Sequence, residues 1–133
     1  MALAPTIVYT GTGGANTYSG VQAGALTTVT DVITIEKTIA AGLTNQTVTC
    51  NIHQASLQTL FLYTDTTATI YTNATSGGAP AHTLTFAANS PLAWTRTQPN
   101  ANPFAATDVT TFYITNNDTV GTLTVRGIIG QNL

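Results

Sequence analysis

The chain has 133 residues, thirty of them threonine, and only eight carry a charge: three Lys or Arg and five Asp or Glu. About a quarter of the residues in an ordinary soluble domain are charged, and a free monomer depends on such charges for solubility. The net charge of −2 argues against nucleic acid or anionic lipid as a partner, and the 43% hydrophobic content argues against disorder. We therefore expect one domain that keeps much of its surface against other subunits.

The cysteine content and the search for targeting signals give little information about function. The single cysteine, Cys50, has no partner for an internal disulfide, and we interpret it as a small buried side chain in a strand. The first five residues lack the basic and apolar regions of a secretory signal, and no apolar run reaches the length of about 18 residues that a membrane helix needs. These features predict a protein made in the cytoplasm and used without export.

The first 24 residues are rich in glycine and predict an extended arm or a long loop. Gly11-Thr12-Gly13-Gly14 follows a strand-like apolar stretch, which is one part of a phosphate-binding loop. Such a loop also needs a helix directly after the glycines, and residues 16–20 are a poor helix start. The pattern favours a flexible segment over a nucleotide site.

Two-residue alternation then predicts strands in series. Residues 29–39 and 46–53 form an expected pair that turns around Gly42. Val32 is out of phase with Ile33 and Ile35, which predicts a bulge or a two-sided strand. Next comes a dense apolar run from Leu57 to Tyr63, typical of a central strand buried on both faces.

Two β-hairpins are predicted in the second half of the chain. Residues 68–72 pair with residues 82–86, whose Leu84 and Phe86 would face the core. Residues 111–115 pair with residues 122–126 across a turn of Asn and Asp residues.

Between these hairpins, residues 97–108 are too long and too proline-broken for a tight turn. A long ordered loop of this kind is typical of an interface or a functional site.

The fold class that follows is all-β: a single-domain antiparallel β-sandwich over residues 1–133, jelly-roll-like, with residues 1–24 as an N-terminal arm. A small barrel is the alternative. Threonine suits a strand backbone and gives its outward face a hydroxyl without a charge. Neutral faces of this kind pack against a neighbour without the desolvation cost of Lys or Glu.

Catalytic chemistry has weak support. His53 lies near Ser56, but a triad is defined by geometry that a sequence does not supply. His53 and His82 have no Cys, Asp or Glu at ligand spacing, and most of the acidic residues lie at expected turns. We expect no catalytic residue, no cofactor and no metal.

The aromatic residues offer a second kind of site. Tyr71, Trp94 and Tyr113 are candidates for a platform that stacks against sugar rings or a protein partner, and Tyr9 and Tyr63 could join it. For Trp94, which alternates with Leu92, core packing is the favoured interpretation.

The chain resembles the small β-sandwich decoration, or cement, proteins of tailed bacteriophage capsids. The resemblance rests on size, the Gly-rich start from Thr10 to Gly14, the Thr-laden hairpins of residues 66–86 and the closing stretch 108–129. It implies a non-enzymatic virion protein on the capsid exterior, a trimer or other oligomer that fastens major capsid subunits. Tail, head-completion and fibre subunits share the same style.

Two segments are expected to contact the virion partner. The partner-binding residues predicted by this reasoning are Tyr9, Thr10, Gly11, Gly13 and Gly14 in the first segment and Pro103 and Phe104 in the second. Glycine loses much backbone entropy on ordering, so the first segment is expected to order on a partner. Phe104 would be either an exposed apolar anchor or a plug for the end of the domain's own core.

Three functions are therefore carried forward. A virion structural protein leads. A carbohydrate-binding or adhesive module is the alternative, and an exposed, coplanar pair of aromatic side chains would favour it. A hydrolase on a jelly-roll scaffold comes third and would need clustered acids or histidines in a cleft.

Overall fold

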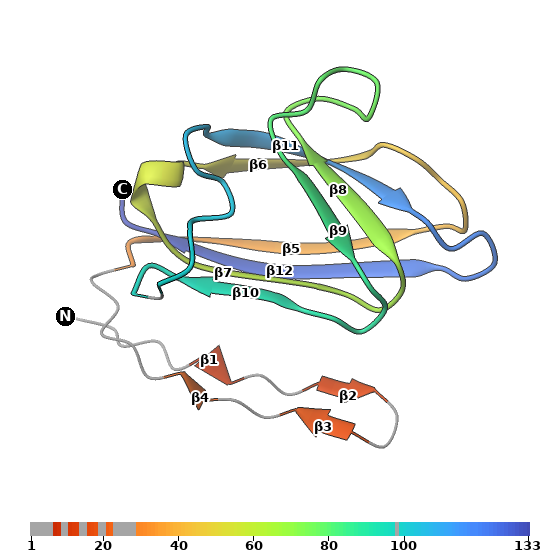
Figure 1. The fold of residues 1–133 in the computed structure, drawn as a ribbon, viewed down its shortest axis with the longest axis horizontal. Coiled ribbons are helices and arrows are strands. Elements are labelled where there is room, and N and C mark those ends of the chain that lie inside the picture. The colour runs from red at the N-terminus through yellow and green to blue at the C-terminus, as the bar shows by residue number, and fades with distance from the viewer. Residues whose placement is uncertain (1–6, 9–10, 14–15, 19–20, 23–28, 98) are drawn as a thin grey trace.

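The computed structural model describes residues 7–8, 11–13, 16–18, 21–22, 29–97 and 99–133. Residues 29–97 and 99–133 form a β-sandwich of two four-stranded antiparallel sheets that face each other (Figure 1). The all-β prediction is confirmed, and the helical content of the described residues is one short 3-10 turn, η1 (Gln54–Ser56).

Each sheet takes its name here from one of its edge strands. The β5 sheet has the order β10 (Leu92–Thr95), β7 (Leu57–Thr64), β12 (Leu123–Gln131) and β5 (Asp31–Ile39). The β6 sheet has the order β6 (Gln46–Ile52), β11 (Val109–Asn116), β8 (Ala68–Thr72) and β9 (Thr83–Phe86).

The hairpin of residues 68–72 and 82–86 is confirmed as the antiparallel pair β8 and β9. Phe86 is buried and Leu84 packs against the core, as the alternation predicted. The central strand of residues 57–63 is also confirmed, because β7 lies between β10 and β12.

Two other predicted pairings are wrong. Strands β5 and β6 turn around Gly42 as expected, yet they belong to different sheets, and so do β11 and β12. Alternation marks which face of a strand is apolar, and turn residues mark where the chain reverses. Neither says whether the chain returns beside the same strand or crosses to the opposite sheet, where the two apolar faces meet each other.

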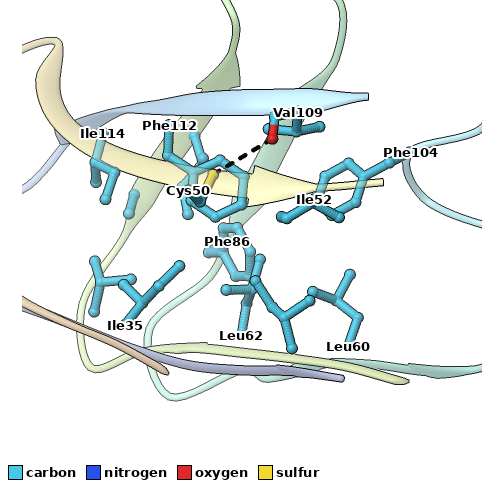
Figure 2. Packing of buried hydrophobic residues seen from close by; sticks show 14 of the residues in the cluster. Ile35, Cys50, Ile52, Leu60, Leu62, Phe86, Phe104, Val109, Phe112 and Ile114 are labelled. Atoms are coloured by element: carbon cyan, nitrogen blue, oxygen red, sulfur yellow. Dashed lines mark hydrogen bonds between the residues drawn. The ribbon is translucent and has the colours of Figure 1, made fainter. Parts of the chain in front are cut away.

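Apolar side chains from both sheets fill the space between them (Figure 2). Phe112 and Ile114 of β11 face Ile35 of β5 and Leu60 and Leu62 of β7, and all five are buried. Burying side chains of this size stabilises the fold by about 1.5–3 kcal/mol each. Strand alternation thus places one continuous apolar core between the two sheets.

Two buried amides join the sheets at opposite ends of the sandwich. Gln131 is fully buried, and its Nε2 donates to Asp31 Oδ2 at 2.7 Å and to the Asn51 carbonyl at 2.8 Å. Its Oε1 accepts from the His53 backbone N–H at 2.9 Å. Since Asp31 and Gln131 lie in the β5 sheet and Asn51 in the β6 sheet, this amide ties the two layers together.

Asn116 does the same at the other end. Its Nδ2 lies 2.9 to 3.2 Å from the carbonyl oxygens of Gly121, Ala40 and Ile39, and its Oδ1 accepts from the Asp118 N–H at 3.0 Å. The amide therefore binds the end of β11 to the turns that follow β5 and precede β12.

The Gly-rich start contains strand pairs in its described residues. β1 (Ile7–Val8) pairs with β4 (Val21–Gln22), and β2 (Gly11–Gly13) pairs with β3 (Asn16–Tyr18). Both pairs share one antiparallel register, as in a single interrupted hairpin. The described part of this segment is thus paired backbone, and its role as an arm stays a prediction.

Candidate binding surfaces

Most of the few charged side chains bond to other groups of the same domain. Seven of the eight charged side chains take part in a hydrogen bond or an ion pair: Asp31, Glu36, Asp65, Arg96, Asp108, Asp118 and Arg126. The eighth is Lys37, half-buried on β5.

The carboxylates mostly hold backbone. Asp65 accepts from the Thr124 N–H at 2.7 Å, and Asp108 accepts from the Gln54 N–H at 2.9 Å. In the turn before β12, backbone N–H groups of Val120 and Gly121, with a further bond from the Thr66 hydroxyl, lower the pKa of Asp118. These carboxylates fix turns and strand ends.

Arginine is used in the same way. Arg96 Nε donates to the Leu57 carbonyl at 2.8 Å, and its Nη2 donates to the Ala55 carbonyl. The ion pair between Arg126 and Glu36 spans 3.7 Å, and both side chains are well exposed, which makes it a weak contact in water.

The outer face of the β6 sheet is neutral. Its ten outward positions are seven threonines, two tyrosines and one asparagine: Thr47, Thr49, Asn51, Thr69, Tyr71, Thr83, Thr85, Thr111, Tyr113 and Thr115. The prediction of neutral, hydroxyl-bearing strand faces is confirmed here. We call these ten positions the hydroxyl face.

Two tyrosines meet at the middle of the hydroxyl face. Tyr113 on β11 lies directly opposite Tyr71 on β8, and both are half-buried. Thr47 on β6 and Thr83 on β9 continue the row to either side. Trp94, the third member of the predicted platform, is buried in the core instead, as its alternation with Leu92 favoured.

The outer face of the β5 sheet carries exposed apolar side chains on its inner strand β12 and its edge strand β5. Val32 on β5 is 59% exposed and Ile128 on β12 is 53% exposed. Gly130 lies opposite Val32 and Phe61 lies opposite Ile128, so the two exposed side chains sit on one diagonal of the same face. We call Val32, Ile128 and the half-buried Phe61 the apolar strip.

The sequence contains a signal for the apolar strip. Ile128 and Ile129 are neighbours on one strand, and neighbours on a strand point to opposite faces. Since Ile129 is buried, Ile128 has to point outward. The out-of-phase Val32 likewise points outward. β5 pairs with β12 without a register shift, and no bulge is present between residues 31 and 39.

Of the predicted partner-binding residues, Tyr9, Thr10 and Gly14 lie outside the described residues. Gly11 and Gly13 lie in β2, opposite Tyr18 and Asn16 of β3. No described contact brings them to a site.

The expectation that Phe104 forms an exposed anchor is wrong. Phe104 is fully buried, its ring centroid lies 6.0 Å from that of Phe112, and His82 meets it edge-on at 5.5 Å. The alternative holds: Phe104 plugs the end of the core. Pro103 beside it is half-buried. Burial of the ring at the open end of the core removes its apolar surface from water, which stabilises the domain without any partner.

Several hydrogen bonds tie the 97–108 loop to the body of the domain. The indole N–H of Trp94 donates to the Asn100 carbonyl at 3.0 Å, and Asn102 Nδ2 donates to the Gln54 carbonyl at 2.9 Å. His82 Nε2 lies 3.3 Å from the Ala105 carbonyl. The loop is therefore part of the packed domain.

His53 pairs with Asp108 and leaves Ser56 aside. His53 Nδ1 lies 3.2 Å from Asp108 Oδ2, while the contact to Ser56 is a backbone bond from the Ser56 N–H to the His53 carbonyl at 2.9 Å. Both side chains of the pair are about half exposed. Among the described residues, no group of three or more His, Cys, Asp or Glu side chains could hold a metal ion.

The chain matches no protein-family profile, no curated protein and no solved structure. In the part of the chain that the structure describes, no helix is long and apolar enough to span a membrane.

Proposed function

We propose that this chain is a non-enzymatic structural protein of a virion, a decoration or cement subunit that binds the lattice of a major capsid protein and stabilises it. The supporting observation is the use of charge: seven of eight charged side chains bond within the domain, and both sheet faces are left largely neutral. With so little surface charge to keep a free monomer soluble, the domain is better suited to an assembly in which neighbouring subunits cover part of its surface.

The strand order adds support. Between residues 31 and 131, each connection crosses from one sheet to the other except the β8–β9 hairpin. Crossing connections are typical of Greek-key sandwiches, among them the jelly rolls that occur in capsid and lectin domains. We infer that this sandwich is jelly-roll-like.

The apolar strip is the proposed surface of attachment. A protein interface needs a desolvated apolar centre, and Ile128 on the inner strand β12 and Val32 on the edge strand β5 are both more than half exposed on one sheet face. Residues 2–14 are a second proposed contact. The subunit is proposed to act as a homo-oligomer, a trimer by the resemblance given above, on the capsid exterior.

Binding to particles tests the function. Particles from the cells that produce the protein are stripped and then incubated with wild type, Ile128→Lys or the matched control Thr85→Lys on the hydroxyl face. We expect wild type and Thr85→Lys to cosediment in a saturable, lattice-symmetric array visible by electron microscopy, and Ile128→Lys to bind at least tenfold more weakly. Absence of wild-type protein from such particles would contradict the proposal.

A further inference from the structure

We propose that the hydroxyl face is a binding site for a neutral polysaccharide, with Tyr71 and Tyr113 as the stacking platform. The inference goes beyond the proposed virion role, because it concerns the sheet face opposite to the apolar strip. It begins from register: β8 and β11 pair so that Tyr71 and Tyr113 are directly opposite each other.

The spacing suits a chain of sugar rings. Adjacent strands lie about 4.8 Å apart, so two opposite tyrosines present two aromatic groups about one hexose apart. The row from Thr47 through Tyr113 and Tyr71 to Thr83 crosses all four strands of the β6 sheet. An extended oligosaccharide laid across the strands would meet the aromatic pair at the centre and hydroxyls at both ends.

Charge selects the class of ligand. None of the ten positions of the hydroxyl face carries a charge, so no side chain there would pair with the phosphate, sulfate or carboxylate of a charged polymer. Threonine and tyrosine hydroxyls both donate and accept hydrogen bonds, as sugar hydroxyls do. A neutral glycan therefore matches the face better than an acidic one.

The hydroxyl face lacks the exposed apolar centre that protein interfaces bury. Among the described residues, the large hydrophobic side chains that are exposed are Val32, Leu43, Val120, Ile128 and Leu133, and none belongs to the hydroxyl face. Protein interfaces bury an apolar centre. The two sheet faces thus differ in kind, apolar on the β5 sheet and hydroxyl-rich with an aromatic centre on the β6 sheet.

Cosedimentation with insoluble polysaccharides tests the proposal. Purified full-length protein is mixed with particles of cellulose, chitin, starch and a β-1,3-glucan, and the protein left in solution is measured. The variants are Tyr71→Thr and Tyr113→Thr, which remove the ring and introduce a β-branched residue suited to a strand, and Tyr71→Phe, which keeps the ring. Tyr63→Thr is the matched control, because Tyr63 lies on the β5 sheet.

We expect wild type, Tyr71→Phe and Tyr63→Thr to bind at least one of the four polysaccharides. Tyr71→Thr and Tyr113→Thr should each weaken that binding by about tenfold or more. Folding of every variant is checked by circular dichroism and unfolding midpoint.

Failure of wild type to bind any of the four, or equal binding by Tyr71→Thr and Tyr113→Thr, would overturn the inference. So would a loss of self-association in these two variants, which would make the face a subunit interface. Attachment to particles is tested separately by Ile128→Lys, so either proposal can fail while the other stands.

Discussion

Replacing Gln131 by Leu should remove the bonds that join the two sheets at one end of the sandwich while keeping the volume of the side chain. The fully buried amide makes three hydrogen bonds of 2.7 to 2.9 Å, one of them to the carboxylate of Asp31. Leucine can make none of them. The backbone carbonyl of Asn51 and the N–H of His53 would lose their partners.

The expected cost follows from the type of bond. A neutral hydrogen bond contributes about 1 kcal/mol net, and one to a charged group about 1.5–3 kcal/mol. His53 and Asn51 are not fully enclosed, so water recovers part of the loss, and leucine gains apolar burial in return. We expect a net loss of about 2–3 kcal/mol in the free energy of unfolding, or about 8–15 °C in the melting temperature for a domain of this size.

Urea unfolding followed by tryptophan fluorescence measures this loss, because Trp94 is the single tryptophan and is buried. The matched control is Gln46→Leu, since the Gln46 amide makes one exposed bond to the nearby Thr44 carbonyl. The control should change stability by less than about 0.5 kcal/mol. A Gln131→Leu protein as stable as the control would refute the role assigned to the buried amide.

Three further changes test other parts of the structure. Asn116→Asp places a carboxylate against three carbonyl oxygens and should lower the free energy of unfolding by about 3 kcal/mol or more at pH 7. Because burial raises the pKa of such an acid, this destabilisation should shrink as the pH falls and the carboxylate is protonated. Urea unfolding at several pH values checks the direction of this pH dependence. Phe104→Ala should destabilise the domain by about 3–5 kcal/mol, measured by thermal unfolding, whereas the control Pro103→Ala at a half-buried position should destabilise it by less than about 1 kcal/mol. An unchanged midpoint for Phe104→Ala would contradict the burial of Phe104 in the core. Burial raises the pKa of Cys50 to about 11, so a thiol reagent at pH 8 should label it only as fast as the domain opens. Above pH 9 the wild type should lose stability that Cys50→Ala retains, because the thiol ionises at lower pH in the unfolded chain than in the folded one. Rapid labelling of the native protein would contradict this.

Local patterns predicted the strands but not all of their partners. Alternation placed Leu84 and Phe86 correctly, and the apolar run from Leu57 marked a central strand. The pairing of β5 with β6 and of β11 with β12 failed, because the choice between returning in one sheet and crossing to the other depends on how distant strands fill the core. A turn sequence contains no information about those distant strands.

The candidate sites show the same limit. Tyr71 and Tyr113 were predicted as members of one platform from residue type, but their opposite positions depend on the register between strands about forty residues apart. From the sequence, Phe104 could be interpreted as an exposed anchor or as a core residue, and only the positions of Phe112 and His82 decide between the two. Long-range register is the physical quantity that a single sequence did not supply.

The placement of charge links the stability of this domain to its proposed roles. Carboxylates such as Asp65 and Asp108 hold backbone N–H groups, and none of the ten positions of the hydroxyl face is charged. A neutral threonine face costs little to desolvate and still satisfies hydrogen bonds. The two sheet faces, one with the exposed apolar side chains of Val32 and Ile128 and one with an aromatic centre at Tyr71 and Tyr113, allow a small domain to contact two chemically different partners at once. On the outer face of the β5 sheet, the cross-strand ion pair of Arg126 with Glu36 is exposed and weak, so a partner that covers the apolar strip would break only a weak contact.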